Sequence, residues 1–300
     1  MAVYSKNGTQ LNAVYGLNGD ALQKAYNKAG TEIFSASTPV VDYSSYTKSN
    51  YCAVSLSPTQ GFDIHNGVIF QFLANSSTVN NRMATVNAST SSIISNNITA
   101  SADHGDSASF SDEYFADDDT YPLLYVTADT NPAKVYINRV TTTTSTLVKT
   151  LSFPLDKTGY YAALCLDIEN GIAYMVGYSK QNYLTDDSGT NKTVISKWDL
   201  TDLTANQDGS YTPAYISSVE REFIYVMQGQ QFHDGMLWIS SGGTNVRGYI
   251  YALDPSTGEL LYTVDTESTT EIEGLAFISD YEMVFGLQGG AYKLVTFAHS

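Results

Sequence analysis

Five short, related stretches contain the residues with the clearest potential for chemistry. Two of them are nearly identical, since residues 60–67 read QGFDIHNG and residues 228–235 read QGQQFHDG. Looser copies begin near residues 104, 161 and 273. The first residues of the five copies are Gln60, His104, Tyr161, Gln228 and Glu273. If these residues meet at one opening, their amide, imidazole, phenol and carboxyl groups could bind a small ligand or a glycan through hydrogen bonds.

The alternative for these five residues is a structural role, in which polar groups at strand starts bond only to water and backbone. Glycine follows four of them, at Gly61, Gly105, Gly229 and Gly274. Because glycine has no Cβ, it permits two backbones to approach closely. We therefore expect the four glycines to lie at a crowded central axis.

Each copy is also a β-hairpin signal. The motif ends in an Asn-Gly or Asp-Gly type turn, and an alternating apolar run follows, such as VIFQF at 68–72 and MLWIS at 236–240. A tight turn between two alternating runs predicts a hairpin. One such unit used repeatedly predicts a repeat architecture.

The strands predicted around these hairpins give an all-β fold, a five-bladed β-propeller. Four repeats supply four strands each, and the last supplies three before the chain ends. The run NYCAVSLSP at 50–58 precedes the first repeat and can provide the missing outer strand of the last blade. Closing the ring in this way removes an open sheet edge. The general design resembles that of YncE, Kelch and WD40 propellers, and a six-bladed propeller, a β-sandwich and a jelly roll are the alternatives.

Two histidines stand just before the turns of the two best copies. These are His65 and His233, and the propeller geometry predicts that they lie on the face opposite the mouth. Matching positions in two blades favour turn and packing roles over a metal pair, and the sequence around them lacks HExxH.

The densest acidic stretch interrupts the first hairpin of the second repeat. It contains Asp112, Asp117, Asp118 and Asp119. Loop carboxylates suit calcium, which makes calcium the candidate cofactor, although the stretch lacks the DxDxDG spacing and a solvated loop is the alternative.

Aromatic residues in or near the predicted loops offer another binding surface. They are Tyr114, Phe115, Tyr121 and Tyr183. Exposed aromatic rings can stack on sugars or anchor a protein interface, while packing between blades is the alternative.

Catalysis is a further alternative. Five-bladed propellers include glycosidases of the arabinanase and invertase type, which use three carboxylates on successive inner strands, although none of the motifs of those enzymes is present here. The predicted inner strands contain Asp63, Asp106, Asp167 and Glu273. A glycosidase needs two carboxyl groups at a defined separation, one of them with a raised pKa. Because Asp63 and Asp167 are expected at other levels of the strands, whether the protein is an enzyme stays open.

Composition restricts the partners. The chain has 300 residues, 23 tyrosines, 15% charged residues and a net charge of −16, which is typical of extracellular all-β proteins. The negative charge disfavours nucleic acid and anionic membranes as partners. No run approaches the roughly 18 apolar residues of a membrane span, and MAVYSKNGTQ lacks the regions of a signal peptide. We expect Cys52 and Cys165 to be buried, with a disulfide left open.

The first 35 residues follow a shorter period. Tyr4, Tyr15 and Tyr26 are 11 residues apart, and a glycine and an aliphatic residue follow each at constant spacing. Each unit predicts a small hairpin that must stack on neighbours or on another chain, and an amphipathic helix at 20–29 is the alternative. The expected modules are residues 1–35, a linker at 36–49 and the propeller at 50–300.

The run AVYSKNGTQLNAVYGLNGDALQKAYNKAGTEIF resembles the short Tyr/Gly/Leu repeats at the start of gut bacteriophage and prophage tail proteins. The resemblance covers about a tenth of the chain, and YD-type repeats of bacterial surface proteins are similar. It implies an attachment segment before an interchangeable module, with self-association through residues 1–35. It also implies a virion or extracellular location, with the bacterial cytoplasm as the alternative.

These observations predict a non-enzymatic recognition or adhesion module of the phage tail or receptor-binding type. Its expected partner is a bacterial cell-surface glycan or protein. A glycan-active propeller enzyme and a protein-binding scaffold propeller are the alternatives.

Overall fold

A computed structural model describes residues 40–73, 82–128, 130–181, 190–203 and 209–300, together with the backbone of four short strands before residue 36. The chain forms two compact units, one of Met1–Val41 with His299–Ser300 and one of Asp42–Ala298. Among the residues that the structure describes, no helix is long and apolar enough to cross a bilayer.

The first unit contains two short antiparallel strand pairs. β1 (Val3–Tyr4) pairs with β2 (Gln10–Leu11), and β3 (Lys24–Tyr26) pairs with β4 (Glu32–Ser35). Each pair brackets a glycine of the 11-residue pattern, and β3 occupies part of the segment for which a helix was the alternative. The other predicted hairpin positions lie outside the described residues.

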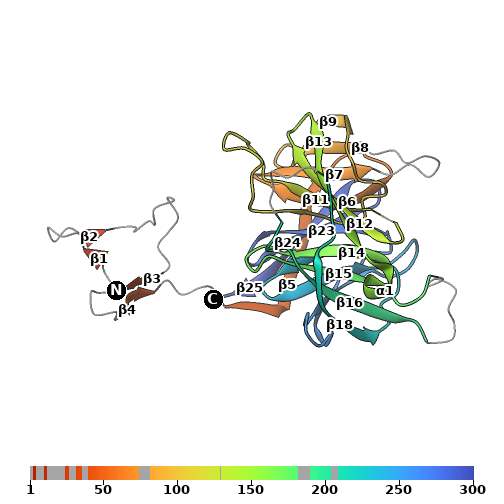
Figure 1. The fold of residues 1–300 in the computed structure, drawn as a ribbon. Coiled ribbons are helices and arrows are strands. Elements are labelled where there is room, and N and C mark those ends of the chain that lie inside the picture. The colour runs from red at the N-terminus through yellow and green to blue at the C-terminus, as the bar shows by residue number, and fades with distance from the viewer. Residues whose placement is uncertain are drawn as a thin grey trace. The chain divides into compact units, whose positions relative to one another are not determined.

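The second unit is a five-bladed β-propeller, as predicted (Figure 1). The first blade consists of β6 (Thr59–His65), β7 (Val68–Leu73), β8 (Arg82–Asn87) and β9 (Ser92–Thr99). The second consists of β10 (Ala108–Phe110), β11 (Leu124–Ala128), β12 (Ala133–Val140), β13 (Ser145–Phe153) and β17 (Gly209–Tyr211). The third consists of β14 (Tyr160–Asp167), β15 (Ile172–Tyr178), β16 (Lys192–Asp199) and β18 (Ala214–Glu222). The fourth consists of β19 (Met227–His233), β20 (Met236–Ser241), β21 (Tyr249–Leu253) and β22 (Leu260–Asp265). The fifth consists of β23 (Ile272–Ser279), β24 (Glu282–Leu287), β25 (Ala291–His299) and β5 (Val41–Ala53).

The ring closes with a strand from before the first repeat, as predicted, because β5 is the outermost strand of the last blade. The predicted bounds of 50–58 are wrong, since β5 ends at Ala53 and residues 54–58 lie outside it. The expected linker at 36–49 is wrong from residue 41 onward, where β5 has already begun. Tyr43 explains the early start: it is 3% exposed, and its ring centroid lies 5.2 Å from that of Trp238 and 4.9 Å from that of Phe297. A Ser/Thr/Tyr-rich segment becomes a strand here because distant aromatic residues bury one of its tyrosines.

One strand was not expected from the sequence. β17 pairs with β13 in parallel and adds a fifth strand to the second blade. Its residues come from the polar insertion that follows β16, which carries no period-2 pattern. A single helical turn, α1 (Leu155–Thr158), joins the second and third blades.

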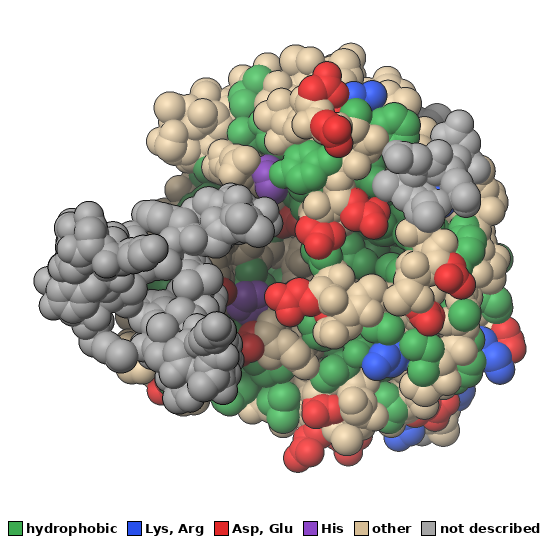
Figure 2. Space-filling model, turned by 60° about the vertical axis from the view of Figure 1, so that its left-hand side comes forward, with side chains coloured by type: hydrophobic (Ala, Val, Ile, Leu, Met, Phe, Trp, Pro, Cys, Tyr) green, Lys and Arg blue, Asp and Glu red, His purple; other side chains and the backbone are tan. Residues whose placement is uncertain are grey.

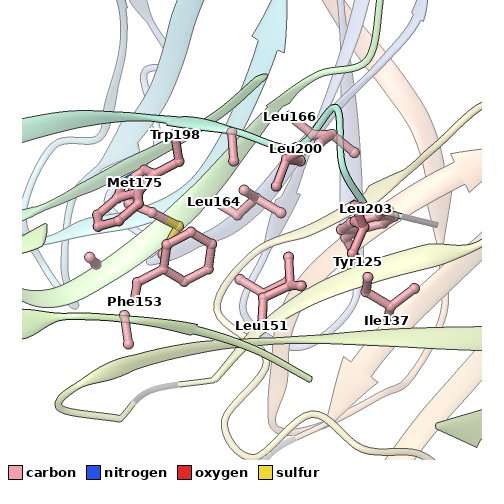
Figure 3. Packing of buried hydrophobic residues seen from close by; sticks show 14 of the residues in the cluster. Tyr125, Ile137, Leu151, Phe153, Leu164, Leu166, Met175, Trp198, Leu200 and Leu203 are labelled. Carbon is pink, nitrogen blue, oxygen red and sulfur yellow. The ribbon is translucent and has the colours of Figure 1, made fainter. Parts of the chain in front are cut away.

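Apolar side chains fill the spaces between neighbouring blades. Between the second and third blades, Phe153 and Trp198 are each 1% exposed and meet edge to face at 5.2 Å (Figure 3). Leu151 and Leu164 belong to the same cluster. Burial of apolar area between sheets is the main term that holds such a ring together. Cys52 and Cys165 are buried free thiols in two of these interblade layers.

Candidate functional site

Four of the five innermost strands are irregular where they enter the channel. A register shift falls after Thr59 in β6, after Tyr160 in β14, after Met227 in β19 and after Ile272 in β23. The residues directly inside these bulges are Gln60, Tyr161, Gln228 and Glu273. A bulge turns a side chain out of the regular strand pattern, and here it does so at equivalent places in four blades. The fifth predicted residue, His104, lies in the turn before β10.

The glycines beside these residues are in backbone contact. A Cβ added to Gly229 would lie 2.3 Å from the Cα of Gly274, and one added to Gly61 would lie 2.6 Å from the carbonyl oxygen of Gly105. The Gly61 N–H donates to that same carbonyl at 2.8 Å. The expectation of a crowded axis is therefore confirmed, and it explains why no side chain fits at these positions.

Three of the five predicted residues come together in one polar group. His104 Nδ1 lies 2.5 Å from Asp106 Oδ1, and Gln228 Nε2 donates to Glu271 Oε1 at 2.7 Å. Glu273 interacts electrostatically with His104, Asp106 and Glu271. We call His104, Asp106, Gln228, Glu271 and Glu273 the mouth group. It joins side chains from the second, fourth and fifth blades, which only a closed ring can do.

Glu273 is the most perturbed member of the mouth group. Its side chain is 3% exposed, and burial raises its pKa to about 8, helped by the negative charges of Glu271 and Asp106. His104 and a hydrogen bond from Gln288 oppose this rise. At neutral pH the carboxyl group is therefore mostly protonated, and it can donate a hydrogen bond as well as accept one.

The remaining two predicted residues are positioned differently. Gln60 is 6% exposed, and its backbone carbonyl accepts from Gln71 Nε2 at 2.5 Å. Tyr161 has a φ of +51°, and its N–H donates to Asn131 Oδ1 at 2.9 Å. The contacts that define the mouth group do not include the side chains of these two residues.

Two members of the mouth group were not predicted as binding residues. Glu271 stands two residues before Glu273, and Asp106 stands two residues after His104. Thr244 also reaches the group, because its hydroxyl donates to Glu271 Oε2 at 3.3 Å. No regular strand pattern marks these residues, since His104 and Asp106 lie in the turn before β10, Glu271 precedes β23, and a register shift falls at Glu273.

Below the mouth, side chains bridge the channel. Ser107 of the second blade donates through Oγ to the Gln230 carbonyl of the fourth blade at 2.9 Å. In the opposite direction, Gln231 Nε2 of the fourth blade donates to the Ala108 carbonyl of the second blade at 2.8 Å. The second and fourth blades are not neighbours in the ring, so these bonds cross the axis. A ligand at the mouth would therefore meet a polar floor.

The carboxylates considered for a glycosidase do not share one level. Asp63 accepts hydrogen bonds from the N–H groups of Ile64 and Phe110, both at 2.7 Å, and burial raises its pKa to about 7. Asp167, at the far end of β14, accepts from the Asn170 side chain at 3.0 Å through both oxygens. Of these four carboxyl groups, those of Asp106 and Glu273 belong to the mouth group. The expectation that Asp63 and Asp167 lie elsewhere is confirmed.

The two motif histidines are packing residues at the inner turns. The His233 ring stacks on Phe277 with centroids 3.8 Å apart, and the His65 ring lies 5.2 Å from that of Phe110. Strand direction puts both turns at the end of the inner strands opposite the bulges. The prediction of turn and packing roles is confirmed.

The carboxylates of the acidic loop are not gathered into a cluster. Asp119 Oδ1 accepts from the Arg139 guanidinium at 2.5 and 2.9 Å, and its Oδ2 accepts from the Ala116 N–H at 3.1 Å. Across the described residues, no group of three or more His, Cys, Asp or Glu side chains is arranged to hold a metal ion. The candidate ligands Asp112, Asp117, Asp118 and Asp119 do not form such a group, and Asp119 is already paired with Arg139.

Of the predicted loop aromatics Tyr114, Phe115 and Tyr121, which the structure describes, Tyr114 is the well exposed one. Tyr114 is 46% exposed. Phe115 packs beneath Arg139, whose guanidinium lies 5.1 Å from the ring centroid, and Tyr121 packs against Phe70 at 4.9 Å. Tyr183 lies outside the described residues. An aromatic binding surface on this loop is therefore reduced to Tyr114.

The surface of the protein agrees with its negative net charge. Figure 2 looks onto one face, where carboxylate side chains are spread among hydrophobic ones and lysine and arginine are few. Such a surface disfavours anionic macromolecules as partners.

The raised pKa values predict a pH dependence of stability. Glu273 and Asp63 bind protons more tightly when folded than when unfolded, so the free energy of unfolding falls as pH rises from about 4.5 toward 8. Each group contributes a slope of at most about 1.4 kcal/mol per pH unit. Urea unfolding at pH 5, 6, 7 and 8 measures this fall, and Glu273→Gln is expected to make it shallower. The exposed Glu169→Gln serves as the control, and equal slopes for both variants would contradict the burial of Glu273.

Comparison with protein-family models gives no match, and the search of curated proteins also finds no matching sequence. Function therefore has to be inferred from the geometry of the mouth.

Proposed function

We propose that the propeller is a recognition module that binds a hydroxylated ligand at the mouth, with a bacterial surface glycan as the expected partner. The observation that carries this proposal is the mouth group itself, in which the buried Glu273, whose pKa is raised to about 8, interacts with His104, Asp106 and Glu271. Three blades contribute to it, and it sits above a polar floor.

The mouth group suits a sugar better than an anion. Sugar hydroxyls both donate and accept hydrogen bonds. The Asp106 and Glu271 carboxylates can accept from them, while the protonated Glu273 and the Gln228 amide can donate. Because two of these groups are anionic, a phosphate or carboxylate ligand would be repelled. A neutral sugar, or one with an amino group, fits this arrangement.

The N-terminal unit is proposed to attach the propeller to a larger assembly. The support is the resemblance of its 11-residue repeats to those of phage tail proteins. Under this proposal the protein acts on a virion or at a cell exterior, and self-association through residues 1–35 presents several propellers at once.

Substitutions in the mouth group test this function. His104→Ala and Gln228→Ala are each expected to weaken glycan binding about five- to thirtyfold, because each removes a hydrogen bond worth about 1 to 2 kcal/mol. Binding of purified protein to a glycan array and to intact bacterial cells measures the loss. Tyr114→Ala is the matched control, since Tyr114 lies on the acidic loop between β10 and β11. Loss of binding in Tyr114→Ala alone would move the site to that loop.

A glycan-active enzyme is the second candidate. The observation that favours it is a carboxyl group with a pKa of about 8 beside a carboxylate, the pairing that glycoside hydrolysis requires. Assay of reducing-sugar release by wild type and Glu273→Gln separates the two functions. The amide retains hydrogen bonding but cannot transfer a proton, so sugar release that this variant abolishes would establish catalysis. Binding without release in both proteins supports recognition alone.

A further inference from the structure

A polar pocket open to solvent lies where the ring closes. Its volume is about 620 Å³, and it lies between residues 48–50 of β5, the segment 266–269 that follows β22, and Phe285, Leu287 and Lys293 of the last blade. This volume lies within the range of small-molecule sites. Residues more than 200 positions apart in the sequence form its walls, and none of them belongs to the mouth group.

The lining of this closure pocket differs in charge from the rest of the protein. It contains two lysines, Lys48 and Lys293, and one carboxylate, Glu267, which leaves a local charge of +1 in a chain of −16. Serine, threonine and asparagine side chains supply hydroxyl and amide groups. Leu287 forms a small apolar part of the wall, while Phe285 lies behind it with 1% of its surface exposed. An anionic ligand that also carries hydroxyl groups matches this combination.

The two lysines are not equivalent. Lys48 Nζ donates to the Asp265 carbonyl at 2.8 Å and forms an ion pair with Glu267 at 2.9 Å. Lys293 Nζ instead donates to the neutral Asn50 Oδ1 at 2.5 Å. Among the residues that the structure describes, no carboxylate lies within ion-pair distance of Lys293. Lys293 can therefore bind an anion without breaking an existing ion pair.

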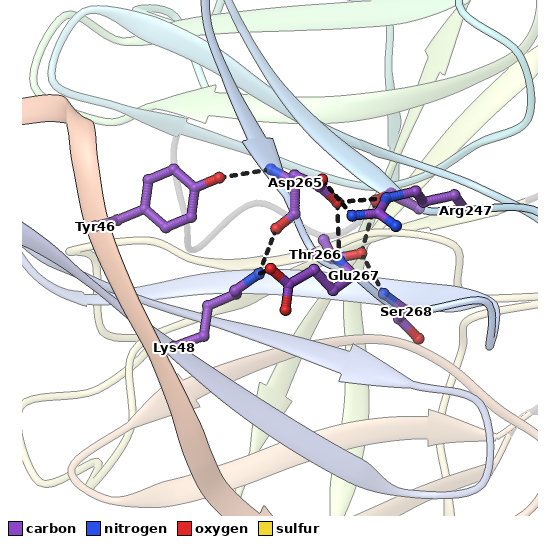
Figure 4. A network of polar contacts seen from close by, with 8 residues as sticks. Tyr46, Lys48, Arg247, Asp265, Thr266, Glu267 and Ser268 are labelled. Atoms are coloured by element: carbon purple, nitrogen blue, oxygen red, sulfur yellow. Dashed lines mark hydrogen bonds and ion pairs between the residues drawn. The ribbon is translucent and has the colours of Figure 1, made fainter.

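The segment that walls the pocket is held in place by a polar network (Figure 4). The Asp265 carboxylate accepts from Arg247 Nε at 2.9 Å and Nη2 at 2.6 Å, and also from the Glu267 N–H at 2.9 Å. The Asp265 N–H donates to the Tyr46 hydroxyl at 2.9 Å, which ties the segment to β5. Thr266 Oγ1 donates to the Gly248 carbonyl at 2.7 Å. Glu267 is thereby held at a φ of +59°, so the wall is formed before any ligand binds.

We propose that the closure pocket binds a carboxylated sugar of the uronic acid class. Its carboxylate would bind Lys293, its hydroxyl groups would bond to the serine, threonine and asparagine side chains, and its apolar face would contact Leu287. A monoanion fits better than a phosphate, because only one ammonium group is without an anionic partner and the lining contains no arginine. The site is separate from the mouth and has the opposite charge preference.

Titration calorimetry of the full chain with D-glucuronate and D-glucose tests the proposal, because the two sugars differ only in the carboxylate at C6. We expect glucuronate to bind at least about tenfold more tightly than glucose, since a charge-assisted hydrogen bond is worth that much. Raising the salt concentration should reduce the glucuronate affinity and leave that of glucose unchanged. Lys293→Gln should remove the preference, Lys293→Arg should retain it, and Lys134→Gln, a lysine of the second blade, should match wild type.

Equal affinities for the two sugars, absence of glucuronate binding, or a preference that survives Lys293→Gln would each overturn the proposal. The Arg variant guards against misfolding as the cause, because it keeps the charge on a side chain of similar length. Failure here is distinct from failure at the mouth, which is tested with His104 and Gln228 variants and with neutral glycans.

Discussion

Gly229→Ala is expected to lower the free energy of unfolding by about 3 kcal/mol, because it overpacks the centre of the ring. The added Cβ would lie 2.3 Å from the Cα of Gly274, 2.7 Å from its carbonyl carbon and 2.8 Å from the Leu275 nitrogen. All three atoms belong to the backbone, so no side-chain rotation can relieve the clash. The inner strands β19 and β23 would have to separate, and the mouth group that they support would be displaced with them.

Gly243→Ala is the matched control for this substitution. A Cβ at Gly243 would have no atom within 4 Å, and its φ lies outside the left-handed region. Its effect is expected to stay within about 0.5 kcal/mol. Thermal and urea unfolding of both variants measure the difference, with a fall in Tm of about 6 to 12 °C expected for Gly229→Ala alone. Equal stability of the two variants would mean that the fourth and fifth blades do not touch at this level.

The blades could be predicted because their signals are local. Each hairpin is specified by a turn dipeptide and the alternating residues that flank it, so Asn66-Gly67 and Asp234-Gly235 mark two of them directly. The same register that fixes the turn fixes the other end of the inner strand. That is why the first residues of the motifs could be expected at one opening, and four of them do occupy equivalent bulges.

The features that were predicted wrongly, or not at all, depend on contacts between residues far apart in the sequence. The start of β5 is set by the burial of Tyr43 against Trp238 and Phe297, which no local pattern around Tyr43 reveals. The acidic loop is a calcium candidate from the sequence, because the sequence does not show that Arg139 of β12 pairs with Asp119 of the loop. The closure pocket is also invisible in the sequence, since β5 and β25 meet only when the ring closes.

The binding residues were only partly predictable for the same reason. Gln228 and Glu273 were found through the motif, but Glu271, which bonds to Gln228, lies outside it. The raised pKa of Glu273 depends on burial and on Asp106 from another blade. A motif thus locates the opening, while the electrostatics of the opening come from the assembled ring.

Removing β5 is expected to abolish the folded propeller. A chain that begins at Val54 lacks Tyr43, whose ring contacts Trp238 and Phe297 and whose hydroxyl donates to Asp234 Oδ2 at 3.1 Å. Loss of one such buried aromatic residue costs about 3 to 5 kcal/mol, and the deletion also leaves β25 with an open edge. Because the free energy of unfolding of a domain is about 5 to 15 kcal/mol, loss of the whole strand is expected to remove most of it. Near-ultraviolet circular dichroism and thermal unfolding measure the outcome.

A chain that begins at Asp42 is the control, since it keeps every residue of the second unit, and it is expected to unfold like the full chain. Tyr43→Ala in the full chain isolates the aromatic anchor and should lower stability by about 3 kcal/mol, against no measurable change for the exposed Ser45→Ala. If the closing strand acts by sheet pairing, a synthetic peptide of residues 41–53 should restore cooperative unfolding to the chain that begins at Val54.

The prediction is contradicted if the chain that begins at Val54 unfolds cooperatively without the peptide and at the Tm of the full chain. The five blades would then hold together without the strand from the other end of the sequence. The closure pocket would then lose Lys48 and Asn50 while the mouth stayed intact, so glucuronate binding alone should disappear.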